Sequence, residues 1–449
     1  MRKIPPVHMA TLAPGHAKPS EILDLGTLGG TSSFTRAMNA HGHVAGDSDI
    51  PGDAAIHAFL WTAGGTDGVV GNPQMKDLGT LGGKTQTVAI NAHGEVIGGS
   101  LSPDGGSRTF LWTHREAPQA RMIELTLGGS LSYPFDIDDG RVVGDSSLPG
   151  DPRGPDGRVI LHAFLWTPGG TDGPAGNPQM KDLGTLGGAI SWATAINAKG
   201  QVTGVSYVPG DSTSHAFLWT PAGTDGVAGN PQMKDLGTLA GDPKHGNSPG
   251  GPSSQALAIN DKGQVAGYSD TGVGAQSHAF LWTPGRTDGV PTNPQMRDLG
   301  SLGGGWSQAP MRSLNAAGHV IGDTVRTDLS RAAFLWTPEG ADGPAGNPQM
   351  RDLGTLGGPS TSAKSLDDGD HVTGASCFSA DLNKQHAFLW TPTGKDGVPE
   401  NPRMKDLGTL GGSSCAVAIN CRGQVAGYSY LPDNVTCHAV LFTKAPRGE

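Results

Sequence analysis

The chain has 449 residues, of which 35% are hydrophobic and only 16% are charged. Its formal net charge is −10, and no run of Lys or Arg supplies the basic face that phosphate binding requires, so we expect no nucleic-acid partner. No stretch approaches the roughly 18–20 apolar residues of a membrane-spanning helix. The 72 glycines recur at fixed places, which indicates turns rather than disorder.

The first residues match no later part of the chain. They are rich in Pro, Ala and His, and we expect 1–21 to be a flexible lead-in and 444–449 a short tail. Arg2 and Lys3 are basic but are followed by no apolar run, so we predict no signal peptide. On that basis the sequence as written predicts a cytoplasmic protein.

Three motifs repeat between these ends. The motif Asp-Leu-Gly-Thr-Leu-Gly-Gly or a variant of it begins at Asp24, Asp77, Glu124, Asp182, Asp235, Asp298, Asp352 and Asp406. A strand-and-turn motif has its turn at Asn39, Asn91, Asp138, Asn197, Asn260, Asn315, Asp367 and Asn420. A third motif is centred on Phe59, Phe110, Phe164, Phe217, Phe280, Phe334, Phe388 and Val440. The three counts agree, so we predict eight repeats of roughly 50–60 residues.

Each repeat is expected to form four short strands, as the fifth repeat illustrates. Small and large apolar residues alternate over 256–259, which predicts a half-buried strand. Residues 260–263 then form a tight turn that the Asn side chain can cap, and 264–269 return as the hairpin partner. The third and fourth strands are expected at 278–283 and 296–302, on either side of a long loop.

Four-stranded repeats of this length are the size of a propeller blade. We therefore predict an all-β protein, a single eight-bladed β-propeller over 22–443. The segment 22–28 would supply the missing fourth strand of the last blade and close the ring, which removes the open sheet edges. The alternative is an open β-solenoid, which would need capping sequences at both ends. A closed ring of this kind is expected to be a monomer.

The third motif is long enough to carry a family resemblance. The segment His57-Ala58-Phe59-Leu60-Trp61-Thr62 and its copies resemble the HAF-repeat family, and the resemblance spans 24–443. It implies an extracellular repeat protein and no defined activity. The compartment therefore stays open between the cytoplasm and the outside of the cell.

The repeated histidines of the third motif have two interpretations. They could serve a metal or acid–base chemistry, or each could hold the Asp of a neighbouring Asp-Leu-Gly segment. Equivalent positions of different blades are too far apart for the ~2 Å bonds to a shared metal, which favours the second interpretation. The long loops, such as 66–75, each offer one carboxylate and ordinary turn residues, so we expect no Ca²⁺ site, no other metal and no cofactor.

The four cysteines are Cys377, Cys415, Cys421 and Cys437. Three of them belong to the last repeat, where a local disulfide is one option. Free thiols are the expected state if the protein stays in the cytosol.

Function is expected where the repeats differ. Five residues before the turn position of the second motif, the chain has Phe34, Gln86, Tyr133, Trp192, Gln255, Pro310, Ser362 and Cys415. Three residues before it, the chain has Arg36, Val88, Phe135, Thr194, Leu257, Arg312, Lys364 and Val417. If these residues lie on the innermost strands, they ring a mouth of the central channel. The predicted ligand-binding residues are Phe34, Arg36, Phe135, Trp192, Arg312 and Lys364; the alternative is that these positions are unconstrained surface.

One departure in the third repeat suggests catalysis. Asp136 replaces the Ala or Ser of the other repeats and lies beside Tyr133 in the sequence. A carboxyl group near the axis can have a raised pKa and act as an acid or base, so Asp136 and Tyr133 are the catalytic candidates. Sequence drift explains the same change. Longer loops at 150–161 and 242–254 are expected to shape an entrance.

The sequence favours a binding module that recognises a small molecule, a glycan or a peptide at one face or in the central channel. The first alternative is a lyase, hydrolase or cyclase that uses a central pocket. The second is a structural repeat scaffold with no pocket.

Overall fold

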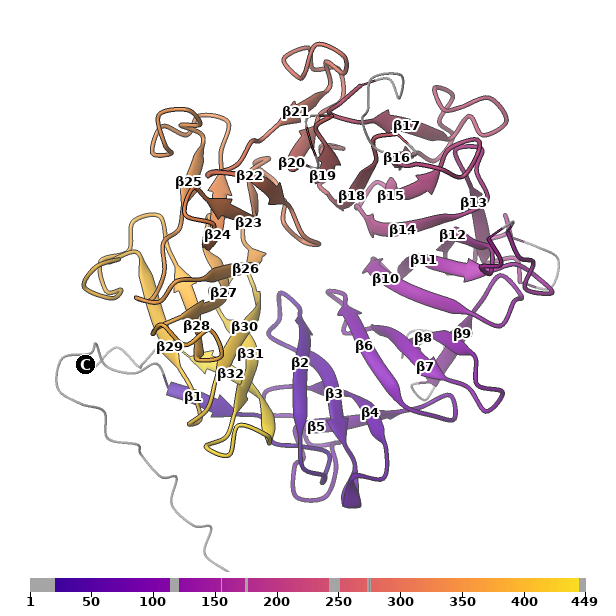
Figure 1. The fold of residues 1–449 in the computed structure, drawn as a ribbon. Helices are drawn as coiled ribbons and strands as arrows, with labels where there is room; N and C mark the ends of the chain where they lie inside the picture. Colours follow the sequence, from indigo (N-terminus) through magenta and orange to yellow (C-terminus); the bar gives the residue numbers. More distant parts are fainter. Residues whose placement is uncertain are drawn as a thin grey trace, which may run out of the picture.

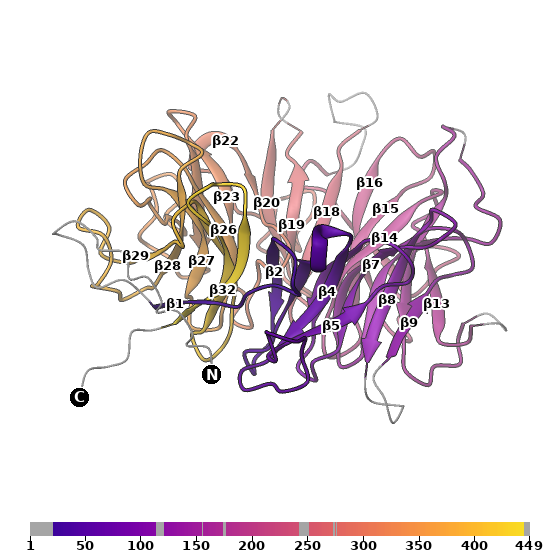
Figure 2. The same ribbon diagram turned by 90° about the horizontal axis from the view of Figure 1, so that it is seen from below.

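The computed structural model describes residues 21–443, apart from 114–120, 155, 174–176, 242–250, 273 and 275. It contains eight four-stranded antiparallel sheets arranged as blades around a ring, which confirms the predicted eight-bladed β-propeller (Figure 1). Seen from the side, the strands run between two faces that carry the loops (Figure 2). The expected lead-in up to residue 20 and the tail at 444–449 lie outside the described residues.

In seven blades the strands follow the chain outward from the axis, and in the eighth the first strand of the chain, β1, is the outermost. Blades 1 to 4 comprise β2 (Ser33–Met38), β3 (Val44–Asp49), β4 (Ile56–Trp61) and β5 (Met75–Gly79); β6 (Thr85–Ile90), β7 (Val96–Leu101), β8 (Ser107–Thr113) and β9 (Arg121–Leu125); β10 (Ser132–Asp138), β11 (Arg141–Ser147), β12 (Leu161–Trp166) and β13 (Met180–Gly184); and β14 (Ser191–Ile196), β15 (Val202–Tyr207), β16 (Ser214–Trp219) and β17 (Met233–Gly237). A short 3₁₀ helix, η1 (Pro51–Asp53), lies between β3 and β4.

Blades 5 to 8 repeat the same order. They comprise β18 (Ser254–Ile259), β19 (Val265–Asp270), β20 (Ser277–Trp282) and β21 (Met296–Asp298); β22 (Gly303–Gln308), β23 (Val320–Arg326), β24 (Arg331–Trp336) and β25 (Met350–Asp352); β26 (Thr361–Leu366), β27 (Val372–Cys377), β28 (Gln385–Trp390) and β29 (Met404–Gly408); and β30 (Ser414–Ile419), β31 (Val425–Tyr430), β32 (Cys437–Thr443) and β1 (Glu21–Asp24).

The hydrophobic core is divided among the junctions between neighbouring blades. One cluster, for example, joins Leu165 and Leu183 of blade 3 to Phe217 and Trp219 of blade 4. Close packing also explains the glycine of each second strand: a Cβ added at Gly46 would lie 2.0 Å from a carbonyl oxygen and 2.7 Å from a Phe ring. Only glycine fits there, which is why this glycine recurs.

The ring is closed by the two ends of the described chain. Strand β1 pairs antiparallel with β32, from Glu21 opposite Thr443 to Asp24 opposite Val440. The predicted closing segment 22–28 is a strand only as far as Asp24. Beyond it, Leu25 and Leu28 are each 3% exposed and pack in the cluster that joins the last blade to the first. The termini therefore complete both a sheet and a core.

The repeated histidines hold the fourth strand of their own blade, as the structural interpretation predicted. In six blades the ring Nδ1 lies 2.8–2.9 Å from an Asp carboxylate; the pairs are His57–Asp77, His162–Asp182, His215–Asp235, His278–Asp298, His386–Asp406 and His438–Asp24. Blades 2 and 6, which lack the histidine, use Arg108 with Glu124 and Arg326 with Asp352 instead. The pairing is kept where the residue types change.

The long loops between third and fourth strands join blades to one another. In blade 1, Asn72 donates a hydrogen bond to the Leu25 carbonyl of the preceding blade, at 2.8 Å. The loop carboxylate of Asp67 pairs with Lys76 at 2.7 Å, and the Lys76 ammonium lies over the Trp112 ring of the next blade. The Asp is therefore occupied by an ion pair. Among the described residues, no group of three His, Cys, Asp or Glu side chains is placed to hold a metal.

All four cysteines are free thiols in this structure. Cys377, Cys415 and Cys437 are buried, and Cys421 is exposed. Burial raises the pKa of the Cys437 thiol to about 12, so this thiol is a weakly reactive core residue.

Candidate functional site

The innermost strand of nearly every blade contains a β-bulge. In blade 1, Thr35 and Ala37 pair with consecutive residues of β3, so Arg36 is the extra residue. The extra residues of seven blades are Arg36, Val88, Phe135, Thr194, Leu257, Lys364 and Val417. A bulge re-aims the side chain of the extra residue. In these seven blades, the variable position three residues before the turn is therefore the bulge residue of the innermost strand.

Blade 6 departs from this pattern. Gln308, not Pro310, lies opposite Asp323 in the place that Phe34 has in blade 1, so two extra residues displace the sequence alignment here. Arg312 lies in the resulting turn with a φ of 59°. Its Nη2 donates a hydrogen bond to the Val88 carbonyl of blade 2, at 3.1 Å. Blades 2 and 6 face each other across an eight-membered ring, so Arg312 spans the axis.

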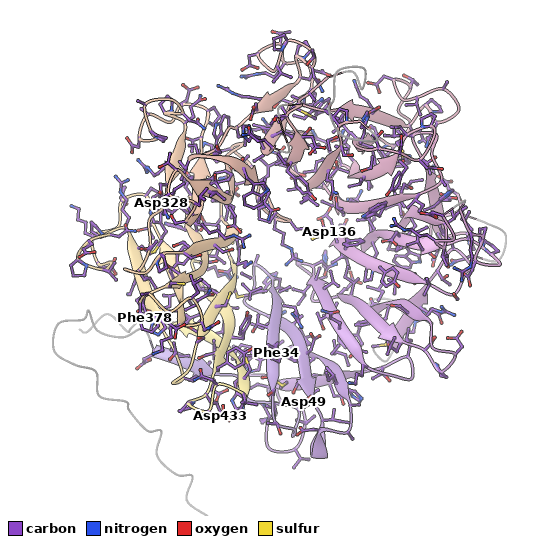
Figure 3. All side chains as sticks on the ribbon, viewed as in Figure 1. Phe34, Asp49, Asp136, Asp328, Phe378 and Asp433 are labelled. Carbon is purple, nitrogen blue, oxygen red and sulfur yellow. The ribbon has the colours of Figure 1, made fainter. Side chains whose placement is uncertain are left out.

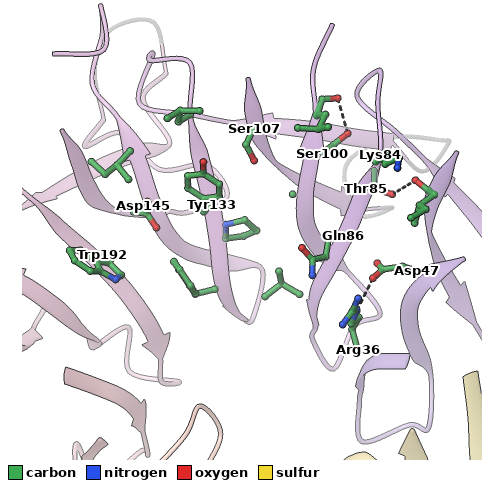
Figure 4. A pocket seen from close by; sticks show the side chains of 18 of the residues that line it. Arg36, Asp47, Lys84, Thr85, Gln86, Ser100, Ser107, Tyr133, Asp145 and Trp192 are labelled. Carbon is green, nitrogen blue, oxygen red and sulfur yellow. Dashed lines mark hydrogen bonds and ion pairs between the residues drawn. The ribbon is translucent and has the colours of Figure 1, made fainter. Parts of the chain in front are cut away.

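A cavity of about 1030 Å³ lies to one side of the axis, over the inner strands of blades 1 to 4 (Figure 4). Five of the eight residues predicted from sequence line it, namely Phe34, Arg36, Tyr133, Phe135 and Trp192. Asp136, Arg312 and Lys364 are not among its lining residues. The size is ample for a small organic molecule.

Aromatic rings form much of the cavity wall. The Trp192 and Tyr207 rings of blade 4 are 6.0 Å apart between centroids. At the other end, the Phe34 ring lines the cavity, and behind it Tyr428 of blade 8, which is not a lining residue, packs edge-on at 5.6 Å between ring centroids. Tyr133 is 37% exposed, so part of its side chain is open to the cavity that it lines. These rings offer flat apolar faces to a ligand.

The loop 150–161, which the sequence suggested as part of an entrance, supplies Arg158, Val159 and Leu161 to the cavity lining. Of the other long loop, 242–254, residues 242–250 lie outside the described residues. Lys84 and Leu131, which immediately precede the inner strands β6 and β10, also line the cavity. Loops of one face of the ring therefore border it.

Sequence reasoning missed a set of buried carboxylates on the second strands. Asp47, Asp145 and Asp323 lie directly opposite Phe34, Tyr133 and Gln308 on the neighbouring inner strands. Each comes directly after the recurring glycine of its strand, and the other blades have Gly, Val, Tyr or Ala at this position. A charged residue in that apolar strand was the available signal. Asp47 and Asp145 line the cavity, and Asp323 does not.

Two of these carboxylates have a guanidinium partner. Arg36 Nε donates a hydrogen bond to Asp47 at 2.7 Å, and the Thr87 backbone N–H donates a second at 2.5 Å. Arg331 approaches Asp323 at 3.3 Å. Burial raises the pKa of Asp47 and of Asp323, and the neighbouring arginine acts in the opposite direction in both cases.

Asp145 differs from the other two. It is 4% exposed, and burial raises its pKa to about 8. Among the described residues, only its own backbone N–H donates a hydrogen bond to its carboxyl. The pKa of the Tyr133 phenol is also raised, mainly by burial and to a smaller extent by the neighbouring Asp145 charge. At neutral pH, Asp145 is therefore mostly an uncharged acid that borders the cavity.

Asp136, the catalytic candidate from the sequence, is placed nearer the axis than the labelled residues of the outer loops (Figure 3). Its carboxylate accepts hydrogen bonds from the backbone N–H groups of Ile137 and, in blade 4, Ile196, at 3.0 and 3.1 Å. Burial raises its pKa, and Arg312 acts against that shift. These bonds join two blades. A catalytic role for Asp136 stays a prediction.

Comparison with known proteins supports the architecture. The chain is similar to the structure of a prolyl endopeptidase, with 12% identity, a TM-score of 0.50, and coverage of 89% of this chain and 54% of that one. It also resembles a puromycin hydrolase, with 10% identity, a TM-score of 0.49, and coverage of 89% and 58%. The chain thus spans little more than half the length of either neighbour. At 12% identity, the likeness to the prolyl endopeptidase shows the propeller fold alone.

No family model and no curated protein sequence matched the chain. The resemblance to HAF repeats therefore stays an expectation. In the part of the chain that the structure describes, no helix is long and apolar enough to cross a membrane.

Proposed function

We propose that this protein is a binding module, and that the cavity over blades 1 to 4 holds a small organic molecule. The observation that carries the proposal is the convergence on one cavity of inner-strand residues that differ between otherwise repeated blades. Phe34, Tyr133 and Trp192 are unlike one another and unlike their counterparts Gln255 and Ser362 in the opposite half of the ring. Aromatic residues occupy this position only in blades 1, 3 and 4, and all three of them line the cavity.

The chemistry of the lining suits such a role. Specific ligand sites combine apolar walls with a few well-placed polar groups. Here the polar groups include the Gln86 side chain, the Arg36–Asp47 pair and Asp145, and the Tyr133 and Trp192 rings lie at the Asp145 end (Figure 4). A glycan or the end of a peptide is a larger ligand that could use the same walls.

One observation favours an enzyme as the second candidate. Asp145 can hold a proton at neutral pH beside the Tyr133 phenol, and a general acid needs that property. A hydrolase, lyase or cyclase would then use Asp145 and Tyr133, with Asp136 as a further candidate. Consumption of a bound compound, abolished in an Asp145→Asn protein, distinguishes an enzyme from a binding module.

A thermal-shift screen with chemically diverse small molecules tests the proposal. We expect some compounds to raise the Tm of the wild type, because a ligand that binds only the folded state stabilises it. Trp192→Ala should remove the shift, since it removes a wall of the cavity. Gln255→Ala is the matched control at the equivalent position of blade 5, and it should keep the shift. Equal shifts in wild type and Trp192→Ala would contradict the proposal, as would no shift with any compound.

A further inference from the structure

The three carboxylates of the second strands permit a comparison within one molecule. Asp47 has its guanidinium partner on the bulge residue of its own blade, Arg36. Asp323 has its partner, Arg331, at the start of the third strand. The structurally equivalent residues around Asp145 are Phe135 and Leu161, because Phe135 is the bulge residue of β10 and Leu161 begins β12. Both cation positions of blade 3 are therefore apolar.

This substitution has an energetic consequence. A carboxylate that is removed from water without a cation or several donors is strongly unfavourable. An ionised Asp145 would face this cost, because the side chain is 4% exposed and has no side-chain partner among the described residues. The two residues at its cation positions, Phe135 and Leu161, line the cavity. In blades 1 and 6 a guanidinium group lies beside the buried carboxylate. In blade 3 no guanidinium of the described residues lies there, and Asp145 borders a cavity that can admit a ligand.

The surroundings of Asp145 favour a positively charged group. Tyr133 and Trp192 lie at the same end of the cavity as Asp145, and Arg36 with Asp47 lies at the opposite end (Figure 4). Aromatic faces attract organic cations, and a carboxylate adds a charge-assisted hydrogen bond. Among the described residues, three cationic side chains line the cavity, namely Arg36, Lys84 and Arg158. Arg36 pairs with Asp47, and the exposed Arg158 pairs with Asp156 at 3.3 Å.

We propose that the cavity binds a small organic cation, an amidinium, guanidinium or protonated amine, whose charged end pairs with Asp145 where an arginine side chain pairs with Asp47. The inference rests on the proposed binding function and names its ligand class. Binding would convert the buried acid into a carboxylate, so the proton of Asp145 would leave to solvent as the cation arrives.

Benzamidine and its uncharged isostere benzamide test the inference, with benzoate as the anionic member of the set. Isothermal titration at pH 7 should show benzamidine binding to the wild type at least about tenfold more tightly than benzamide, the factor expected for a hydrogen bond to a charged group. Titration in two buffers of different ionisation enthalpy should show release of about one proton per bound benzamidine. Agmatine and phenethylamine extend the test to the other two cation types.

Two variants separate the charge pair from the rest of the cavity. Asp145→Asn keeps the shape of the protonated acid, and it should weaken benzamidine by about tenfold or more and abolish proton release. Phe135→Arg places a guanidinium where Arg36 lies in blade 1, and it should exclude benzamidine by pairing with Asp145 itself. Gln255→Ala should bind benzamidine as the wild type does.

The failure of this inference differs from the failure of the proposed function. If benzamide or benzoate binds as tightly as benzamidine and Trp192→Ala removes the binding, the cavity is a ligand site but not a cation site. If benzamidine, agmatine and phenethylamine all fail to bind while other compounds bind at Trp192, the inference is likewise overturned and the proposed function stands. If nothing in the screened library binds, both are wrong.

Discussion

At the scale of single residues, the environment of a carboxyl group decides what it can do here. Asp47 and Asp145 occupy equivalent places on β3 and β11 and are equally buried, at 4% exposure each. One has an arginine partner and the other has an aromatic residue in its place. Since burial penalises the charged form and no cation of the described residues lies beside Asp145, its pKa is raised to about 8 and it is expected to be largely protonated at neutral pH.

This difference predicts a pH-dependent effect of Asp145→Asn on stability. The pKa of Asp145 is about 8 in the folded chain, against roughly 4 for an Asp in an unfolded chain. Between these values the folded state binds more protons than the unfolded state, so the wild type loses stability as the pH rises through that range. The Tm of the variant minus that of the wild type should therefore increase from about pH 4 to about pH 8 and then level off.

Thermal unfolding followed by circular dichroism at stepped pH provides the measurement. Gln255→Ala replaces no titratable group, so its Tm difference should stay flat. A flat difference for Asp145→Asn as well would show that the folded-state pKa of Asp145 is not raised.

The sequence predicted the cavity residues better than it predicted their chemistry. Differences stand out in a repeat protein, which is why Phe34, Tyr133 and Trp192 could be recognised. Asp145 was missed because its chemistry depends on lacking the arginine that Asp47 has, and the positions of the two blades can be compared only once the strand register is known. Arg312 was found, but its reach across the axis depends on a two-residue insertion that the motif spacing concealed.

At the scale of the strands and turns, the repeated motifs link each blade to the next. Asn39 accepts hydrogen bonds from two backbone N–H groups of its own turn, at 3.0 Å, as the turn chemistry predicted. Its Nδ2 also donates to the Asn91 carbonyl of blade 2, at 3.0 Å, a link that a single repeat cannot show. Local rules predicted the turn, and only the ring geometry explains the second bond.

The closing strand gives the prediction at this scale. A chain that begins at Glu21 keeps β1 and should unfold at the Tm of the full chain. A chain that begins at Gly29 loses the pairing of β1 with β32 and the burial of Leu25 and Leu28, and its Tm should fall sharply. Truncation of one buried leucine to alanine typically costs about 2–5 kcal/mol.

The two shortened chains can be compared by thermal unfolding. A double variant, Leu25→Ala with Leu28→Ala, keeps the strand and isolates the contribution of the core. Equal Tm values for the two shortened chains would contradict closure by β1.

At the scale of the whole molecule, the ring of eight similar blades carries its cavity on one side, over blades 1 to 4. The period of the motifs determines blade number and closure, so these could be predicted from sequence. The position of the cavity could not, because it depends on which side chains of blades 1 to 4 leave space between them. The Arg312 side chain reaches blade 2 across the axis, beside the Val88 that also lines the cavity.

The ligand site that we propose lies in the cavity beside Tyr133, Trp192 and Asp145. The most direct measurement is a crystal structure after soaking with a fragment set that contains aromatic cations, neutral aromatics, acids and sugars. We predict that fragments concentrate in the cavity over blades 1 to 4, with a cationic group against Asp145 and an aromatic or aliphatic part against Trp192 and Tyr133. Fragments spread evenly over the ring, or an empty cavity at every soak, would show that the cavity is not a ligand site.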